Sequence, residues 1–228
     1  MCGARRKNCL PGRISRARGR ILETEKGMVD SEGGTTMSEW NLKETLLDKE
    51  DVFNGTLLHV ERWRAQLPNG AIATREMIRH VGASAIVPVD EEGNVYLVRQ
   101  YRAPIARETL ELPAGKLDSK AEDRLQAAKR ELAEETGLRA KEWVKLADMA
   151  AAAAYTDEVV SIYLARGLEK GEAHLDDDEF LRVVKMPLRE LCDMAAAGKI
   201  QDSKTLCGAL LAERYIGGKY AIEPENCQ

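Results

Sequence analysis

Cysteine and histidine are scarce in this sequence, which narrows the kinds of site that it can form. The three histidines, His59, His80 and His174, are scattered without metal-binding spacing, so structural or surface roles are expected for them. The five cysteines form neither a C-x-x-C pair nor a zinc spacing: Cys2, Cys9, Cys192, Cys207 and Cys227. This argues against a disulfide framework and a zinc site, and it indicates reduced thiols in a cytoplasmic protein.

Long hydrophobic runs and a strong net charge are also absent. No apolar stretch approaches the roughly 20 residues that a membrane-spanning helix needs, so no membrane association is expected. The 228 residues carry a formal net charge of −4, which gives no bulk attraction to nucleic acid. The length suits one domain, or one domain with extensions.

Acidic residues are missing from the first 20 positions, where basic ones gather instead: Arg5, Arg6, Lys7, Arg13, Arg16, Arg18 and Arg20. An arginine-rich start without acids can be a transit peptide or an arm that binds nucleic acid. The segment has no amphipathic periodicity and cannot bury a core. We therefore expect residues 1–36 to be a disordered basic tail.

The most informative stretch that is present runs from Glu111 to Leu138. Its helical part carries Glu131, Glu134 and Glu135 within about one turn. Carboxylates gathered on one helix face repel one another, and a fold tolerates them if they are solvated or if a divalent cation neutralises them. Ligands that are all oxygen favour a hard ion, Mg²⁺ or Mn²⁺.

Local signals set the ends of this helix, which we expect over residues 124–136. Asp123 is the preferred N-cap, with Gln126 three residues later, although Ser119 with Glu122 also has the pattern of a capping box. Gly137 stands where a left-handed residue ends a helix. The face opposite the glutamates is apolar and should be buried: Ala121, Leu125, Ala128 and Leu132.

The rest of the chain mixes strands with helices. Residues 40–49 are expected to be a lead-in, and Leu67-Pro68-Asn69-Gly70 a turn between two strands. The acidic run Asp176-Asp177-Asp178-Glu179 is expected to be solvated. Strands are predicted over 53–66, 72–79, 83–89, 95–101, 144–150, 159–165 and 179–185, and helices over 188–197 and 203–215. Without strict alternation, this order predicts an α/β fold with a mixed sheet sandwiched between α-helices.

The glutamate-rich stretch resembles the Nudix box, G-x5-E-x7-R-E-U-x-E-E-x-G-U, in which U is a bulky aliphatic residue. Six residues separate the first glycine from the first glutamate instead of five, and the extra residue falls in a loop, where an insertion costs little. An unrelated fold with a solvated acidic helix is the alternative. The matching positions are Gly115, Glu122, Arg130, Glu131, Leu132, Glu134, Glu135, Gly137 and Leu138.

Further motifs resemble the ADP-ribose pyrophosphatase branch of the Nudix family. One departure is Ala152-Ala153-Ala154, which stands where that branch usually has Ser-Pro-Gly, in a loop that helps to set substrate choice. The motifs that agree are Leu67-Pro68-Asn69-Gly70, Val98-Arg99-Gln100-Tyr101-Arg102, Glu111-Leu112-Pro113-Ala114-Gly115, Tyr155-Thr156-Asp157-Glu158 and Asp202-Ser203-Lys204-Thr205.

The resemblance implies a Nudix fold with an N-terminal β extension over residues 37–80, used for dimerisation, and a hydrolase domain over residues 81–228. It implies a homodimer that hydrolyses ADP-ribose to AMP and ribose 5-phosphate with Mg²⁺, or with Mn²⁺. The alternatives are hydrolysis of another nucleoside diphosphate derivative, such as an ADP-sugar or NADH, and a regulatory module that binds ADP-ribose without cleaving it. The intact carboxylate cluster favours an enzyme.

The resemblance also assigns roles around the metal. The ligands would be the carboxylates of Glu131, Glu135 and Glu134 and the backbone carbonyl of Ala114. Arg130 would orient the carboxylates through charge-assisted hydrogen bonds. Glu134 and Arg130 would thereby also serve catalysis.

Four more residues are assigned to catalysis or to substrate. Glu158 would be the general base, unless it is a solvated loop carboxylate. Arg102 would hold a phosphate or the terminal ribose, or else form a surface salt bridge. Trp63, beside Arg64, would stack on adenine across a dimer interface, with simple packing in the sheet as the alternative, and Arg64 is expected to contact substrate as well.

Overall fold

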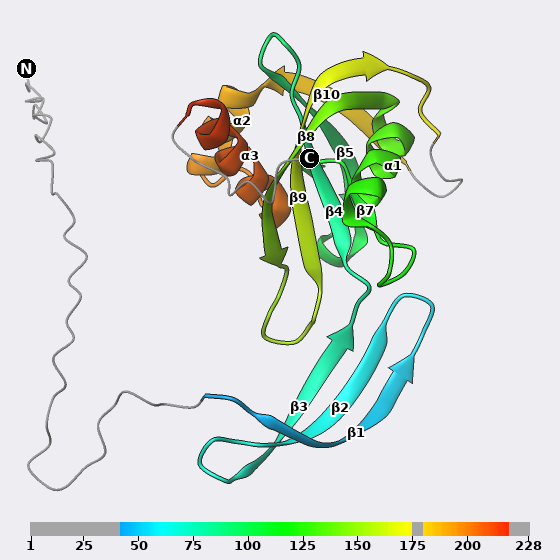
Figure 1. Ribbon diagram of the computed structural model, residues 1–228, viewed down its shortest axis with the longest axis vertical. Coiled ribbons are helices and arrows are strands. Elements are labelled where there is room, and N and C mark those ends of the chain that lie inside the picture. The colour runs from blue at the N-terminus through cyan, green and yellow to red at the C-terminus, as the bar shows by residue number, and fades with distance from the viewer. Residues whose placement is uncertain (1–41, 175–179, 219–228) are drawn as a thin grey trace, which may run out of the picture. The chain divides into compact units, whose positions relative to one another are not determined.

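The computed structural model describes residues 42–174 and 180–218, whose strands and helices are drawn in Figure 1. The basic segment 1–36 and the acidic run Asp176-Asp177-Asp178-Glu179 lie outside this part of the chain. None of the helices within it is long and apolar enough to cross a membrane.

Three antiparallel strands form an N-terminal sheet in the order β1-β2-β3. They are β1 (Thr45–Asn54), β2 (His59–Gln66) and β3 (Ile72–Arg79). The turn predicted between β2 and β3 is confirmed. The Leu67 N–H donates to the Ala71 carbonyl at 2.8 Å, and Gly70 has a φ of +84°, which a glycine adopts without strain.

The prediction for residues 40–66 was wrong in one respect. Residues 45–49 of the expected lead-in belong to strand β1, and the single strand expected over 53–66 is interrupted between Asn54 and His59. All ten residues of β1 are exposed. A strand without a buried face has no hydrophobic alternation to reveal it in the sequence.

Two further sheets form the centre of the fold. One is mixed, in the order β7-β4-β9-β8, and its strands β4 and β9 are parallel. The other is antiparallel, in the order β10-β5-β6. The strands of the mixed sheet are β4 (Ala83–Pro88), β7 (Ala114–Lys116), β8 (Leu138–Ala150) and β9 (Val159–Lys170). Those of the other are β5 (Asn94–Arg102), β6 (Arg107–Glu111) and β10 (Leu181–Pro187), with the 3₁₀ helix η2 (Ala103–Ile105) after β5.

Three α-helices cover the two faces of the mixed sheet. They are α1 (Arg124–Thr136), α2 (Leu188–Ala196) and α3 (Ser203–Ile216). Residues of β4 alternate between two hydrophobic clusters: Ile86 packs in the cluster that contains Leu132 of α1, whereas Val87 packs in the one that contains Leu191 of α2. The predicted α/β fold, a mixed sheet between helices, is confirmed (Figure 1).

The helix of the glutamate-rich stretch has the predicted bounds. The Asp123 side chain accepts the Gln126 N–H at 2.9 Å, and Gly137 has a φ of +67° with its N–H bonded to the Ala133 carbonyl. Leu132 is fully buried, and burying such a side chain contributes about 1.5–3 kcal/mol. Helix α1 is therefore fixed at both ends and along its apolar face, so the position of its glutamates is fixed too.

Candidate active site

The inner face of α1 carries Glu131 and Glu135, which are 8% and 4% exposed. Both lie against the Ala114–Lys116 strand: the Ala114 N–H donates to Oε2 of Glu135 at 3.0 Å, and Glu131 approaches Gly115. Glu134 points more to solvent, with a side chain that is 41% exposed. The structure thus brings two of the three predicted carboxylate ligands beside Ala114, whose carbonyl was the fourth predicted ligand.

Gly115 lets the Glu131 carboxylate approach the loop backbone. A Cβ atom at position 115 would lie 2.1 Å from Cδ of Glu131, much closer than real Cβ contacts come. The glycine is therefore required here by close approach and not by an unusual backbone angle. This contact explains physically why a glycine opens the motif.

The donor set is suited to a hard divalent cation. It consists of two carboxylates one helical turn apart and a backbone carbonyl, all of them oxygen. Within residues 42–174 and 180–218, no group of three or more His, Cys, Asp and Glu side chains could hold an ion by itself. An ion bound by Glu131 and Glu135 would complete its shell with water and phosphate oxygens, which is how Mg²⁺ is usually bound at phosphate-processing sites.

Arg130 joins the carboxylates to the loop. Its Nη1 donates to Oε1 of Glu131 at 2.6 Å and to Oε2 of Glu134 at 3.2 Å. Its Nη2 donates to the Lys116 carbonyl at 3.1 Å and lies 3.4 Å from Oε1 of Glu122. Burial lowers the pKa of Arg130, but Glu131 and the neighbouring acids outweigh it and raise the pKa. Arg130 thus contacts Glu131, Glu134 and Glu122 at once, and Glu122 reaches it despite the extra loop residue.

Arg102 forms an ion pair with the buried carboxylate of Glu111, while its own side chain stays partly exposed to solvent. Its Nε and Nη2 donate to the two carboxylate oxygens of Glu111 at 2.8 and 2.6 Å. Lys204 Nζ and Thr109 Oγ1 also donate to this carboxylate, each at 2.5 Å. Burial would raise the pKa of Glu111, but the bonds to Arg102 and Lys204 lower it from its ordinary value of 4.5 to about 2.

The loop after the box is attached to the end of β3. The Ile78 N–H donates to the Tyr155 carbonyl at 2.7 Å, and the His80 N–H donates to Oδ1 of Asp157 at 2.7 Å. Glu158 lies on this loop, with Oε1 at 3.6 Å from Nδ1 of His80 and a partly buried side chain. The backbone that carries Glu158 is thus attached to the end of β3, and the Glu158 carboxylate lies beside His80.

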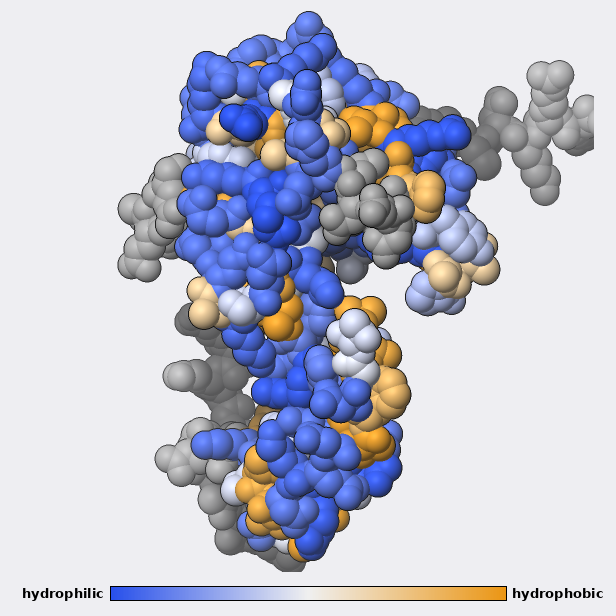
Figure 2. Space-filling view, turned by 90° about the vertical axis from the view of Figure 1, so that its right-hand side faces the viewer, coloured by the Kyte–Doolittle hydropathy of each residue, from blue (hydrophilic) through white to orange (hydrophobic). Residues whose placement is uncertain are grey.

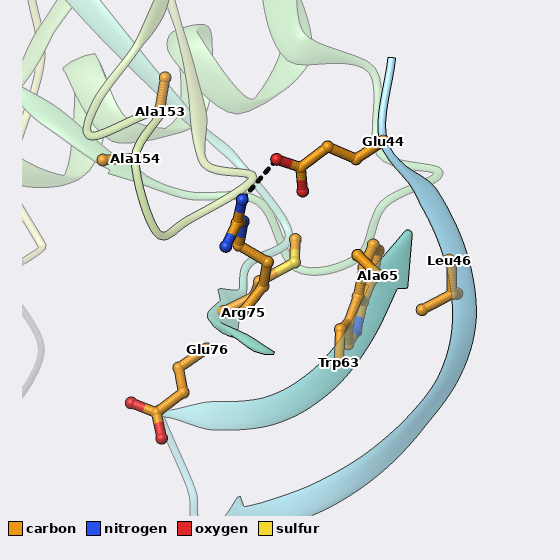
Figure 3. A pocket seen from close by; sticks show the side chains of 9 residues that line it. Glu44, Leu46, Trp63, Ala65, Arg75, Glu76, Ala153 and Ala154 are labelled. Atoms are coloured by element: carbon orange, nitrogen blue, oxygen red, sulfur yellow. Dashed lines mark hydrogen bonds and ion pairs between the residues drawn. The ribbon is translucent and has the colours of Figure 1, made fainter. Parts of the chain in front are cut away.

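Trp63 and Arg64 lie on opposite faces of β2, as alternation along a strand requires. The Trp63 indole N–H donates to Glu61 at 2.7 Å, and the ring lines a cavity of about 230 Å³. Figure 3 shows Trp63 at this cavity with Ala153 and Ala154 of the post-box loop. The side chain of Arg64 is exposed and pairs with Asp48 at 2.8 Å, outside the cavity.

No catalytic or binding role was predicted from the sequence for three residues of this region. Glu111 and Lys204 were identified only as members of two sequence motifs. Their side chains are in contact although they lie 93 positions apart in the chain. His80 was expected to be structural or at the surface, yet it lies beside Glu158. The motif that contains Lys204 was the available signal, but nothing in it reveals which partner the lysine meets.

The comparisons with known proteins agree with this geometry. The model of the NUDIX domain matches residues 78–207, more than half of the chain. The ADP-ribose pyrophosphatase of Bacillus subtilis is 35% identical over 188 residues, covering 82% of this chain and 99% of that protein. The methanol dehydrogenase activator of Bacillus methanolicus is 37% identical over 183 residues, covering 79% of this chain and 96% of that protein.

A solved structure described as an ADP compounds hydrolase superposes with a TM-score of 0.70 at 25% identity. It covers 81% of this chain and 100% of the matched chain. The resemblance noted in the sequence is therefore confirmed by the family model, by full-length relatives and by fold. The chain belongs to the Nudix family of hydrolases.

Proposed function

We propose that this Nudix hydrolase cleaves the pyrophosphate bond of ADP-ribose to give AMP and ribose 5-phosphate, with Mg²⁺ as its cofactor. The observation that carries the proposal is the pair of buried carboxylates, Glu131 and Glu135, held against Ala114 and Gly115 by hydrogen bonding and close approach. The 35% identity to the ADP-ribose pyrophosphatase of Bacillus subtilis supports the substrate.

Different residues are proposed to bind the metal and to orient its ligands. Glu131, Glu135 and the Ala114 carbonyl would hold the divalent cation, which when bound neutralises phosphate charge and lowers the pKa of bound water. Arg130 keeps the Glu131 carboxylate in one orientation through the 2.6 Å bond, so the ligand is preorganised. Glu134 remains the third carboxylate, available from the more exposed side of the helix.

Glu158 is the proposed general base. It accepts no hydrogen bond from an arginine or lysine in the described chain, and its neighbour is the imidazole of His80 at 3.6 Å. No arginine or lysine of the described chain therefore occupies its carboxylate oxygens, which leaves them available to accept a proton from water. The bonds from Asp157 to the end of β3 hold the loop that carries Glu158.

Trp63 is the proposed platform for adenine. Its ring lines the cavity that Ala153 and Ala154 also line, so a base stacked there would contact the loop expected to govern substrate choice. The small alanine side chains favour a broader specificity, so that an ADP-sugar such as ADP-glucose is a second candidate substrate beside ADP-ribose. Arg64 lies outside this cavity, and a substrate contact from it would have to come from another copy of the chain.

The active form is proposed to be a homodimer assembled through the N-terminal sheet. The lower part of Figure 2 shows hydrophobic side chains among polar ones at the surface. The exposed hydrophobic residues of this sheet include Leu46, Leu47, Val52, Phe53 and Ile72. Exposed apolar groups in this number favour burial against a second copy. Sedimentation velocity should give twice the mass of the chain, and a monomer at micromolar concentration would contradict the assembly.

A substrate panel tests the proposed reaction. ADP-ribose, ADP-glucose and NADH are each incubated with enzyme and Mg²⁺, and the phosphomonoesters released are measured with a coupled phosphatase. ADP-ribose should give the highest kcat/KM, and a chelator should abolish turnover. A kcat/KM ten times higher for another compound would make that compound the substrate instead of ADP-ribose. Binding of ADP-ribose without any turnover would favour the regulatory alternative. The variant Glu142→Gln, at an exposed position of β8, controls for loss of one carboxylate away from α1.

A further inference from the structure

The motif Asp202-Ser203-Lys204-Thr205 begins helix α3 and connects it to the segment that leads to Ala114. Ala114 lies beside the face of α1 that carries Glu131 and Glu135, which is called the metal face below. The Asp202 carboxylate accepts the Thr205 N–H at 2.9 Å and so caps the helix. The Thr205 hydroxyl accepts the Leu112 N–H at 2.8 Å. The start of α3 is thereby fixed to the backbone two residues before Ala114.

Lys204 makes the second connection, through side chains. Its Nζ donates to Oε2 of Glu111 at 2.5 Å and to Oδ1 of Asp202 at 2.9 Å, and its side chain is only 13% exposed. Glu111 is 2% exposed. A lysine this deeply buried loses most of its side-chain freedom, and its charge is balanced by two carboxylates. Lys204, Glu111 and Asp202 therefore form a largely buried ion-pair network, which is unlike an isolated salt bridge at the surface.

Four donors fix the orientation of the Glu111 carboxylate. Lys204 holds Oε2, Thr109 holds Oε1, and Arg102 donates Nε and Nη2 to the two oxygens. In a two-point arginine–carboxylate pair the guanidinium lies nearly in the plane of the carboxylate, so fixing one group fixes the other. Without Lys204 the carboxylate would keep Thr109 as its only other side-chain donor and could rotate together with Arg102.

The free edge of Arg102 is the part that can meet a substrate. The pair with Glu111 uses Nε and Nη2, whereas Nη1 makes no hydrogen bond to the described residues, and the side chain is 43% exposed. The hydrogen bonds that Arg102 donates to Glu111 raise the pKa of Arg102, and the negative charges of Asp202 and Glu135 add to this. Glu135 of the metal face is thus within electrostatic reach of the guanidinium.

We propose that Lys204 is a positioning residue for Arg102: acting through the buried Glu111 carboxylate, it holds the guanidinium so that Nη1 presents a fixed donor to a phosphate oxygen of the substrate. The substrate contact rests on the proposed function, whereas the coupling between Lys204 and Arg102 does not. A donor fixed in advance loses little freedom on binding, which is the general advantage of preorganised sites.

Kinetics of two Lys204 variants and one control test the effect on substrate. Lys204→Met should raise KM for ADP-ribose by about tenfold with a smaller change in kcat, because a ground-state phosphate contact is weakened. Lys204→Arg, which can still bridge the two carboxylates, should restore KM to within about threefold of wild type. Lys185→Met removes a comparable ion pair, 2.7 Å from Asp90, near the opposite end of β5, and should leave KM unchanged. An unchanged KM in Lys204→Met would overturn the role in binding.

The coupling itself has a readout that needs no substrate. The ¹⁵Nε–¹Hε NMR resonance of Arg102, assigned by its loss in Arg102→Lys, reports the hydrogen bond to Glu111. It should shift or broaden in Lys204→Met, return in Lys204→Arg and stay in place in Lys185→Met. An unmoved resonance in Lys204→Met would refute the positioning role even if activity fell. If wild-type protein failed to cleave ADP-ribose while the resonance followed Lys204, the proposed function would fail and the coupling would stand. If Lys204→Met does not fold, Lys204→Gln takes its place with the same expected results.

Discussion

Substitution of Gly115 by alanine should lower the activity of the enzyme while leaving the stability of the fold nearly unchanged. The added Cβ would lie 2.1 Å from Cδ of Glu131. Carbon atoms in contact need about 3.5–4 Å, so the carboxylate must move by roughly 1.5 Å. The atoms that collide are the end of a flexible side chain, so Glu131 moves and the backbone does not. A displacement of about 1 Å in a reacting site can cost on the order of 10²-fold, and kcat/KM should fall by at least that factor.

The stability of Gly115→Ala should change little, because Gly115 has no left-handed backbone angle that an alanine would strain. Gly93→Ala is the matched control: its φ is +81° and the added Cβ would meet nothing within 4 Å. A left-handed alanine costs about 1–2 kcal/mol, so the Tm of the control should fall by roughly 2–8 °C with kcat/KM unchanged. Steady-state kinetics and thermal unfolding of both variants check this. Wild-type kcat/KM in Gly115→Ala, or a loss explained by unfolding, would refute the close-approach argument.

Three other substitutions follow from the same geometry. Glu135→Gln should lower kcat by about 10²-fold or more in saturating Mg²⁺ without lowering Tm, as measured by kinetics and thermal unfolding, because an anionic ligand is lost while the helix gains relief from repulsion. Glu111 has a pKa of about 2 in the folded protein, so its stabilisation is complete above its unfolded pKa and is lost as pH falls through 2. Urea unfolding should show the stability difference between wild type and Glu111→Gln shrinking by about 3 kcal/mol from pH 6 to pH 2. Replacing Ala152, Ala153 and Ala154 by Ser, Pro and Gly should raise kcat/KM for ADP-ribose relative to ADP-glucose, because proline restricts the open loop, and an unchanged ratio would show that the loop does not select.

Features encoded by neighbouring residues were predictable from the sequence. Helix α1 has the predicted bounds because Asp123 caps Gln126 and Gly137 bonds to Ala133, and each of these contacts joins residues only a few positions apart. The turn at Gly70 likewise depends on its own backbone angle. The placement of Glu131 and Glu135 on one face of α1 followed from their spacing along the helix, which a local sequence pattern reveals directly.

Features that depend on distant contacts were not predictable. Lys204 reaches Glu111 across 93 positions, and the partner of a buried lysine is decided by how α3 packs on the sheet. His80 meets Glu158 only because the post-box loop pairs with the end of β3. Strand β1 escaped prediction for a different reason, since it buries no face and is stabilised by its pairing with β2.

The most direct test of the central claim is the product of ADP-ribose turnover by wild-type protein and Glu135→Gln. Chromatography of the reaction in Mg²⁺ should show AMP and ribose 5-phosphate in equal amounts from wild type, no products after chelation, and about one hundredth of the rate or less from the variant. Products in any other ratio, or equal rates from the two proteins, would contradict a pyrophosphate cleavage that depends on the carboxylates of α1.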